Sequence, residues 1–173
     1  MTLKSIISGG QTGADQAGLA AAVDLGLEPG GWLPKRCWTD DGPRPDFIQV
    51  YKMKECPMEG YPTRTEWNVR DSDGTVIFGN ENSPGCTLTK RLCKRLAKPL
   101  IINPTPDELR TWVDERKIAI LNVAGNRERT NRGIFGRTYK ILVEAFGTAA
   151  DVDVRESAGR MLERHRKSLE RLA

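Results

Sequence analysis

The sequence contains few histidine and cysteine residues, on which zinc sites, disulfide frameworks and many catalytic triads depend. Its 173 residues include one histidine and four cysteines. The cysteines, Cys37, Cys56, Cys86 and Cys93, have neither CxxC spacing nor a neighbouring histidine, which argues against a zinc site or a disulfide framework. The histidine, His165, would have to serve alone in any catalytic triad. The composition therefore predicts free thiols, no metal site and no histidine-based catalysis.

Long apolar runs are also missing. No segment approaches the roughly 20 apolar residues that span a bilayer, and the opening MTLKSIIS is too short in apolar residues for a secretory signal. We therefore expect a soluble, cytoplasmic protein with no membrane partner. The net charge of +4 permits an anionic ligand. The basic pairs at 90–91 and 94–95 have no aromatic residues between them, so we expect a solvated helix face and no nucleic-acid partner.

Apolar, β-branched segments alternate with helical segments along the chain. The candidate strands are 4–8, 30–34, 74–79, 98–103 and 117–125. This alternation predicts a three-layer, Rossmann-like α/β fold, with a mostly parallel sheet of about five strands and helices on both faces. We place this single domain at residues 1–147. Residues 148–173 are predicted to form a C-terminal helical extension, because apolar residues recur at helical spacing between Val154 and Leu172.

Several helix boundaries can be predicted from local signals. Residues 14–25 have small and apolar side chains on nearly every side, which suits a helix packed closely on the sheet, and Gly26 would end it. Thr63–Glu66 and Thr105–Glu108 both fit the capping-box pattern of a helix start. The proline-rich stretch 34–62 has little periodicity, and we expect an ordered excursion over the ligand-binding edge of the sheet.

The residues that follow the predicted strands are rich in glycine, amide and arginine side chains. The first strand is followed by GGQTG (9–13), the third by GNENSPGCT (79–87), the fourth by Asn103 and the fifth by GNRER (125–129). Ligands of open α/β sheets bind at these strand ends, where glycines bring backbone N–H groups close to an anion and arginines add donors. A tight turn explains any one cluster equally well. Three clusters at one edge favour a phosphate cradle, although neither GxGxxG nor GxxxxGK[ST] is present.

Five blocks of sequence carry a resemblance to a known family. They are GGQTGADQAGL (9–19), DLGLEPGGWLPK (24–35), DDGP (40–43), YPTRTEWNVRDSDGT (61–75) and LNVAGNRE (121–128). Together they resemble the molybdenum cofactor carrier family, within a wider Rossmann-like group that includes the lysine-decarboxylase-like (LOG) phosphoribohydrolases. The match runs from about Leu3 to Phe146. The resemblance implies a homo-oligomeric carrier that binds the molybdenum cofactor, a pterin phosphate, without converting it, with molybdoenzymes as recipients.

The strand-end loops and the matching motifs together define the expected ligand site. The predicted cofactor-binding residues are Gly9, Gly10, Gln11, Thr12, Gly13, Asp15, Lys35, Arg64, Asn68, Asp71, Gly79, Asn80, Gly85, Thr87, Gly125 and Arg127. No catalytic residue is predicted. No protein ligand for the metal is predicted either, because the resemblance implies that the pterin dithiolene would hold the metal. The chain has Cys86 where the resemblance leads us to expect a second glycine.

The alternative to a carrier is an enzyme that hydrolyses the N-glycosidic bond of a nucleoside monophosphate, as LOG proteins do. The LOG motif PGGxGTxxE ends in a glutamate, whereas the corresponding stretch here has Lys90 near that place. This departure favours carriage over catalysis. A carboxylate from Glu66, Asp71, Glu81 or Glu128 could still support hydrolysis.

Overall fold

The structure is a computed structural model, and it describes residues 2–58 and 61–147. The elements are β1 (Ser5–Ser8), α1 (Ala14–Asp24), β2 (Glu28–Leu33), the short 3-10 turn η1 (Lys35–Cys37), β3 (Trp38–Thr39), β4 (Gly42–Pro43), α2 (Asp46–Val50), β5 (Lys54–Glu55), α3 (Tyr61–Arg70), β6 (Gly74–Phe78), α4 (Pro84–Arg95), β7 (Leu100–Ile102), α5 (Pro106–Glu115), β8 (Ile120–Gly125) and α6 (Ile134–Phe146). The predicted extension at 148–173, with its helix and His165, lies outside the described residues.

The central sheet has six strands in the order β5-β2-β1-β8-β6-β7, and all of its neighbouring strands are parallel. The predicted α/β, Rossmann-like fold is therefore confirmed. The additional strand is β5, which is only two residues long and has no apolar pattern of its own. A separate antiparallel hairpin joins β3 and β4.

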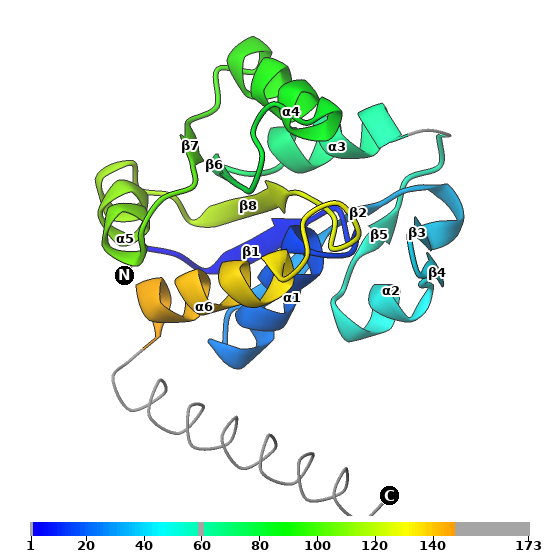
Figure 1. Cartoon of the computed structure of the whole chain (residues 1–173), viewed down its shortest axis with the longest axis horizontal. Coiled ribbons are helices and arrows are strands. Elements are labelled where there is room, and N and C mark those ends of the chain that lie inside the picture. Colours follow the sequence, from blue (N-terminus) through cyan, green and yellow to red (C-terminus); the bar gives the residue numbers. More distant parts are fainter. Residues whose placement is uncertain (1, 59–60, 148–173) are drawn as a thin grey trace, which may run out of the picture.

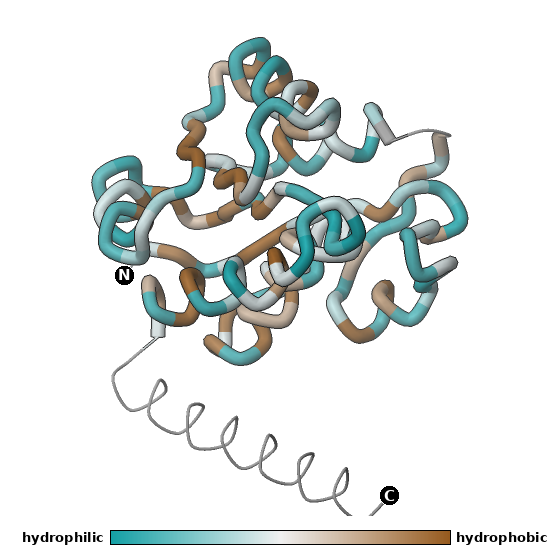
Figure 2. Tube along the Cα trace, in the orientation of Figure 1, coloured by the Kyte–Doolittle hydropathy of each residue, from teal (hydrophilic) through white to brown (hydrophobic). Residues whose placement is uncertain are grey.

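Helices cover both faces of the sheet (Figure 1). One face packs against α1, α5 and α6 in the largest apolar cluster, which includes Leu109 and Leu142. The other face lies under α3 and α4, where Val69 and Leu92 belong to a smaller cluster. In Figure 2 the strands carry many of the apolar segments, while the strand-end loops are mostly hydrophilic or neutral. The polar loops at the strand ends are thus left to shape a site.

The predicted boundaries of α1 and α5 are confirmed. Gly18 lets α1 approach the sheet, because a Cβ there would lie 2.8 Å from the Cβ of Val123, and Gly26 follows the helix with φ +67°. At α5 the Thr105 Oγ1 accepts a hydrogen bond from the Glu108 N–H, and the Glu108 carboxylate accepts one from the Thr105 N–H at 2.8 Å. These backbone and hydroxyl donors lower the pKa of Glu108.

The predicted helix start at Thr63 is wrong. The helix α3 already begins at Tyr61, so Thr63 lies inside its first turn. Glu66 does not reach back to a cap, because its carboxylate pairs with Arg95 of α4 at 2.8 Å. The capping-box pattern therefore matched by chance, because the Glu66 side chain points to the neighbouring helix α4.

The excursion between β2 and α3 is ordered over its described residues, as expected. It contributes Phe47, Met53 and Cys37 to a third apolar cluster, which packs on Leu33 at the end of β2. All four cysteines of the chain are buried and free. In the described part of the chain, no helix is both long and apolar enough to cross a membrane.

Candidate ligand-binding site

A cavity of about 120 Å³ lies at the carboxyl ends of the central strands. Eight of the predicted ligand-binding residues line it: Gly9, Gln11, Asp15, Arg64, Asn68, Gly85, Gly125 and Arg127. The remaining lining residues are Thr65, Cys86, Leu88, Thr89, Asn122, Val123 and Ala124. The cavity is therefore built from the loop after β1, the end of β8, α3 and the first turns of α4.

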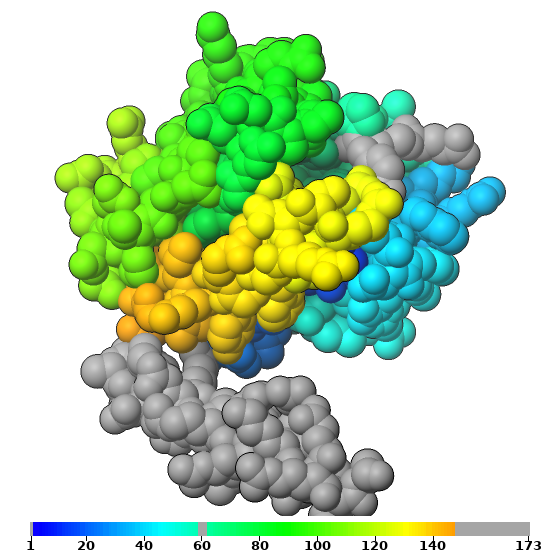
Figure 3. All heavy atoms as spheres, in the orientation of Figure 1, coloured from blue at the N-terminus to red at the C-terminus, as the bar shows by residue number. Residues whose placement is uncertain are grey.

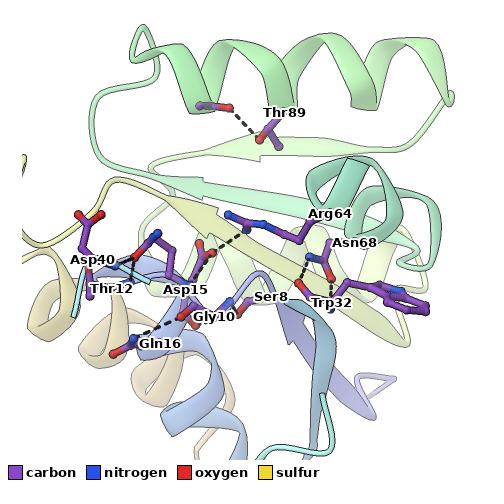
Figure 4. Close-up of polar contacts among 12 residues, drawn as sticks. Ser8, Gly10, Thr12, Asp15, Gln16, Trp32, Asp40, Arg64, Asn68 and Thr89 are labelled. Atoms are coloured by element: carbon purple, nitrogen blue, oxygen red, sulfur yellow. Dashed lines mark hydrogen bonds and ion pairs between the residues drawn. The ribbon is translucent and has the colours of Figure 1, made fainter. Parts of the chain in front are cut away.

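Asp15 and Arg64 form a buried ion pair in the cavity wall (Figure 4). Arg64 Nη1 lies 3.1 Å from Asp15 Oδ2, and the two side chains are 12% and 8% exposed. Gly9 makes the pair possible, because a Cβ there would lie 1.3 Å from Arg64 Nη1. Burial raises the pKa of Asp15, although Arg64 and the N–H of Gln11, which donates to the same carboxylate, oppose the increase.

Three other glycines are explained by close packing inside the protein. A Cβ on Gly13 would lie 2.4 Å from the Asn126 carbonyl oxygen, and one on Gly125 would lie 2.3 Å from the Phe78 carbonyl oxygen. A Cβ on Gly10 would lie 2.5 Å from Leu33 Cδ2. Gly10 and Gly13 also have positive φ angles of +70° and +84°. Gly13 therefore lets the loop after β1 pack against the loop after β8, while Gly10 and Gly125 allow close contacts with the ends of β2 and β6.

The excursion reaches the site through the tip of the β3–β4 hairpin. The Asp40 N–H donates to Gln11 Oε1 at 2.8 Å, and its carboxylate accepts a hydrogen bond from Arg127 Nη1 at 2.7 Å. Arg129 adds a longer ion pair of 3.4 Å to the same carboxylate. In Figure 3 the yellow residues around the loop after β8 lie between the green region of α4 and the cyan-blue excursion. Asp40 was absent from the predicted ligand set, and only its place in the DDGP block could have singled it out.

The first turn of α4 forms another part of the cavity wall, through Gly85 and Cys86. Ser83 caps this helix by accepting a hydrogen bond from the Cys86 N–H at 3.4 Å. Gly85 is exposed, and a Cβ there would meet no atom within 4 Å. Cys86 is 2% exposed and fits beside Asn126, whose Nδ2 lies 3.6 Å from its Sγ. The cysteine found in place of a glycine therefore packs inward, and Gly85 keeps the helix start open.

Asn68 and Asp71, both predicted ligands, have partners within the protein. Asn68 is 2% exposed, and its amide accepts from the Trp32 N–H at 2.9 Å and donates to the Trp32 carbonyl at 3.1 Å. Asp71 lies beyond α3, away from the cavity, where it accepts from Trp32 Nε1 at 2.7 Å and pairs with Arg70. The Arg70 guanidinium is the main cause of the lowered pKa of Asp71. Asn68 anchors the edge of β2, and its contact with a ligand stays a prediction.

The loop after β6 is also held by protein contacts. The Gly79 N–H donates to Asn103 Oδ1 at 2.7 Å, and the Asn80 N–H donates to Asn126 Oδ1 at 2.6 Å. Asn126 Nδ2 in turn donates to Ser83 Oγ at 3.1 Å. The remaining predicted residues outside the cavity lining are Gly10, Thr12, Gly13, Lys35 and Thr87. The structure thus joins the loops after β1 and β8 with α3 and α4, and leaves the loop after β6 to one side.

Sequence reasoning missed three polar residues of the wall, Thr65, Thr89 and Asn122. Thr89 faces the cavity one turn into α4, and its hydroxyl donates to the Gly85 carbonyl at 3.0 Å. Asn122 lies inside β8, is 2% exposed and donates to Thr75 Oγ1 at 3.1 Å. An amide in the middle of an apolar strand was the available signal for Asn122, whereas nothing distinguishes Thr89 from other helical threonines.

The fold and this site define a Rossmann-like α/β protein with a ligand cavity at the carboxyl edge of its sheet. A family model described as the circularly permutated YpsA SLOG family matches residues 6–146. The chain belongs to this family.

A crystal structure of a "Putative molybdenum carrier protein" from Syntrophus aciditrophicus is similar to it, at 34% identity with a TM-score of 0.75. The match covers 85% of this chain and 96% of that chain, so the resemblance seen in the sequence motifs is confirmed. A search of curated protein sequences gives no match.

Proposed function

We propose that this protein binds the molybdenum cofactor, or a metal-free pterin phosphate of the same type, in the cavity between α3, α4 and the strand ends. The observation that carries the proposal is the convergence of Arg64 and Arg127 with the open helix start at Gly85 on one cavity. The similar chain named as a molybdenum carrier supports the choice of ligand. The metal would travel as cargo, held by the pterin dithiolene.

Each part of the cavity suits one part of such a ligand. Guanidinium groups and the first N–H groups of a helix are the usual partners of phosphate in proteins. Arg64 is held by Asp15, which fixes the orientation of its guanidinium group in the cavity wall. The amide of Asn122 and the hydroxyl of Thr89 add polar groups that can meet the ring donors and acceptors of a pterin.

Native mass spectrometry of protein purified under anaerobic conditions tests the proposal. We expect a retained mass that corresponds to a pterin phosphate, with or without molybdenum. Arg127→Ala should weaken binding of a monophosphorylated pterin by about 1.5–3 kcal/mol, the scale of a hydrogen bond to a charged group. Arg132→Ala is a matched control, because this exposed arginine lies in the same loop and outside the cavity lining. Equal affinity of the two variants would contradict a phosphate contact by Arg127.

N-glycosidic hydrolysis remains the second candidate because of one observation, the buried carboxyl of Asp15 in the cavity wall with its raised pKa. Lys90, near the place of the LOG glutamate, is paired with Glu81 at 3.0 Å and supplies no carboxylate. Incubation with nucleoside monophosphates should therefore release no free base. Release that depends on the protein and is lost in Asp15→Asn would favour the enzyme over the carrier.

The carrier proposal also includes the assembly state and the recipients. We propose a homo-oligomer that delivers its ligand to molybdoenzymes. Light scattering of the purified chain measures the assembly, and transfer of a bound pterin to a cofactor-free molybdoenzyme measures delivery. A monomer, or the absence of transfer by ligand-loaded protein, would contradict the corresponding part.

A further inference from the structure

Gln11 has an amide group whose orientation is fixed by the backbone. The residue is 5% exposed and lines the cavity. Its Oε1 accepts hydrogen bonds from the Thr12 N–H at 2.9 Å and from the Asp40 N–H at 2.8 Å. A backbone N–H can only donate, so the atom that meets both groups must be the oxygen. The Nε2 group is therefore the end of the amide that remains for another partner.

That Nε2 group is buried and has no acceptor among the described residues. A buried donor without a partner costs free energy, and most native proteins avoid it. Neighbouring amides in the same region are paired: Gln16 Nε2 donates to the Gly10 carbonyl at 3.2 Å, and Asn126 Nδ2 donates to Ser83 Oγ. Gln11 Nε2 lacks such a partner, as does the neighbouring Thr12 Oγ1, so this part of the loop after β1 holds polar groups that the described residues leave unmet.

The charges around the cavity define the chemical class of this acceptor. Arg64 and Arg127 line the same cavity as Gln11, and the two nearby carboxylates are already engaged, Asp15 by Arg64 and Asp40 by Arg127. A cavity wall with two guanidinium groups and a spare amide donor favours an anionic oxygen over a neutral carbonyl.

We propose that Gln11 Nε2 is a specificity-determining donor to a phosphate oxygen of the bound ligand, and that the Asp40 backbone, by fixing Gln11 Oε1, turns this donor toward it. This inference rests on the proposed function for the location of the ligand. It adds that the phosphate of the ligand is the group recognised and that Gln11 Nε2 is the atom that recognises it. A ligand without an anionic oxygen at this place would leave the donor unmet.

Gln11→Glu tests the proposal with the smallest change in shape. One carboxylate oxygen can keep the hydrogen bonds from Thr12 and Asp40, while the other replaces the Nε2 donor by a negatively charged acceptor. Gln49→Glu is the matched control, because it adds the same charge at an exposed position of α2. Gln11→Met, which removes the donor without adding charge, is the second variant if the glutamate does not fold.

Three probes are titrated against each folded variant: a monophosphorylated pterin, the same pterin without phosphate, and inorganic phosphate. We expect Gln11→Glu to lose on the order of 10–100-fold in affinity for the phosphorylated pterin and to lose little for the dephosphorylated one. Gln11→Met should lose roughly 10-fold for the phosphorylated probe. The increase in melting temperature caused by inorganic phosphate should persist in Gln49→Glu and disappear in Gln11→Glu.

The outcomes separate this inference from the proposed function. Unchanged affinity of both Gln11 variants for a phosphorylated pterin that the wild type binds would overturn the inference alone. Equal losses for both pterins would assign Gln11 to the ring and also overturn it. Phosphate binding that depends on Gln11, in a wild type that binds no pterin, would support the inference and overturn the choice of ligand. A wild type that binds none of the three probes would overturn both.

Discussion

The loop after β1 and the loop after β6 both follow buried parallel strands, and both are rich in glycine and amide residues, yet the structure uses them differently. The loop after β1 places Gly9, Gln11 and Asp15 in the cavity wall and retains a buried amide donor without a protein partner. In the loop after β6, the backbone of Gly79 and Asn80 is bonded to side chains from the next two strand ends. Composition alone therefore does not distinguish a ligand loop from a structural one. The difference lies in whether the polar groups already have partners.

Asn126→Ala should have the largest effect on stability, because this amide holds the loop after β6 to the start of α4. The substitution leaves the Asn80 N–H without its partner and removes one of the two hydrogen bonds that Ser83 Oγ accepts. We expect the free energy of unfolding, measured by urea denaturation, to decrease by about 3 kcal/mol. Asn131→Ala removes only one donor to the same amide and should cost less than half as much. Similar small losses in both variants would contradict the central role of Asn126.

Gly9→Ala and Gly85→Ala sharpen the comparison between the walls of the cavity. An alanine at 9 collides with Arg64 and separates it from Asp15, so we expect lower stability by about 1–3 kcal/mol together with weaker binding of a monophosphorylated pterin.

An alanine at 85 meets open space, so the stability of Gly85→Ala should be unchanged or slightly higher than that of the wild type. Its methyl group narrows the approach to the helix start, and the affinity alone should fall. An affinity of Gly85→Ala equal to that of the wild type would remove the first turn of α4 from the site.

The strand pattern predicted the fold because buried parallel strands are apolar and helices alternate with them. It missed β5, whose two residues, Lys54 and Glu55, have no apolar pattern and pair with Trp32 and Leu33. The capping box at α5 was predicted correctly because both of its hydrogen bonds are local in sequence. The same pattern failed at Thr63, since the partner of Glu66 is Arg95, which lies far along the chain.

The candidate site could be predicted only in part for the same reason. Motifs pointed to the glycine loops and to Arg64 and Arg127, because these residue types at strand ends are typical of anion sites, and the structure places Gly9, Arg64 and Arg127 in the cavity lining. Motifs could not predict that the Asn68 side chain is hydrogen-bonded to the backbone of Trp32, or that the Asp40 N–H donates to Gln11. Such contacts join residues that are 36 and 29 positions apart. Only the three-dimensional arrangement separates the amides that have protein partners from Gln11, whose buried Nε2 has none among the described residues.

The pH dependence of stability tests the buried ion pair in the loop after β1. Since burial raises the folded-state pKa of Asp15 above 3.8, the folded protein holds this proton more tightly than the unfolded chain. The stability that this proton provides is fully present below pH 3.8 and is lost as the pH rises through the folded pKa. Urea denaturation should show that the wild type loses stability relative to Asp15→Asn over this range. A difference between the two proteins that stays constant with pH would contradict the raised pKa.

Asn80→Ala should have the smallest effect, and it separates the two loops most directly. The Asn80 side chain accepts one exposed hydrogen bond, from the Asn82 N–H at 3.0 Å, while its backbone makes the contacts with Asn126. Because alanine keeps that backbone, we expect a stability loss of about 0.5 kcal/mol and no change in affinity for a monophosphorylated pterin. Calorimetric titration beside Gln11→Met, which removes an amide from the other loop, provides the comparison. A loss of affinity in Asn80→Ala as large as that in Gln11→Met would place the loop after β6 in the ligand site and end the distinction between the two loops.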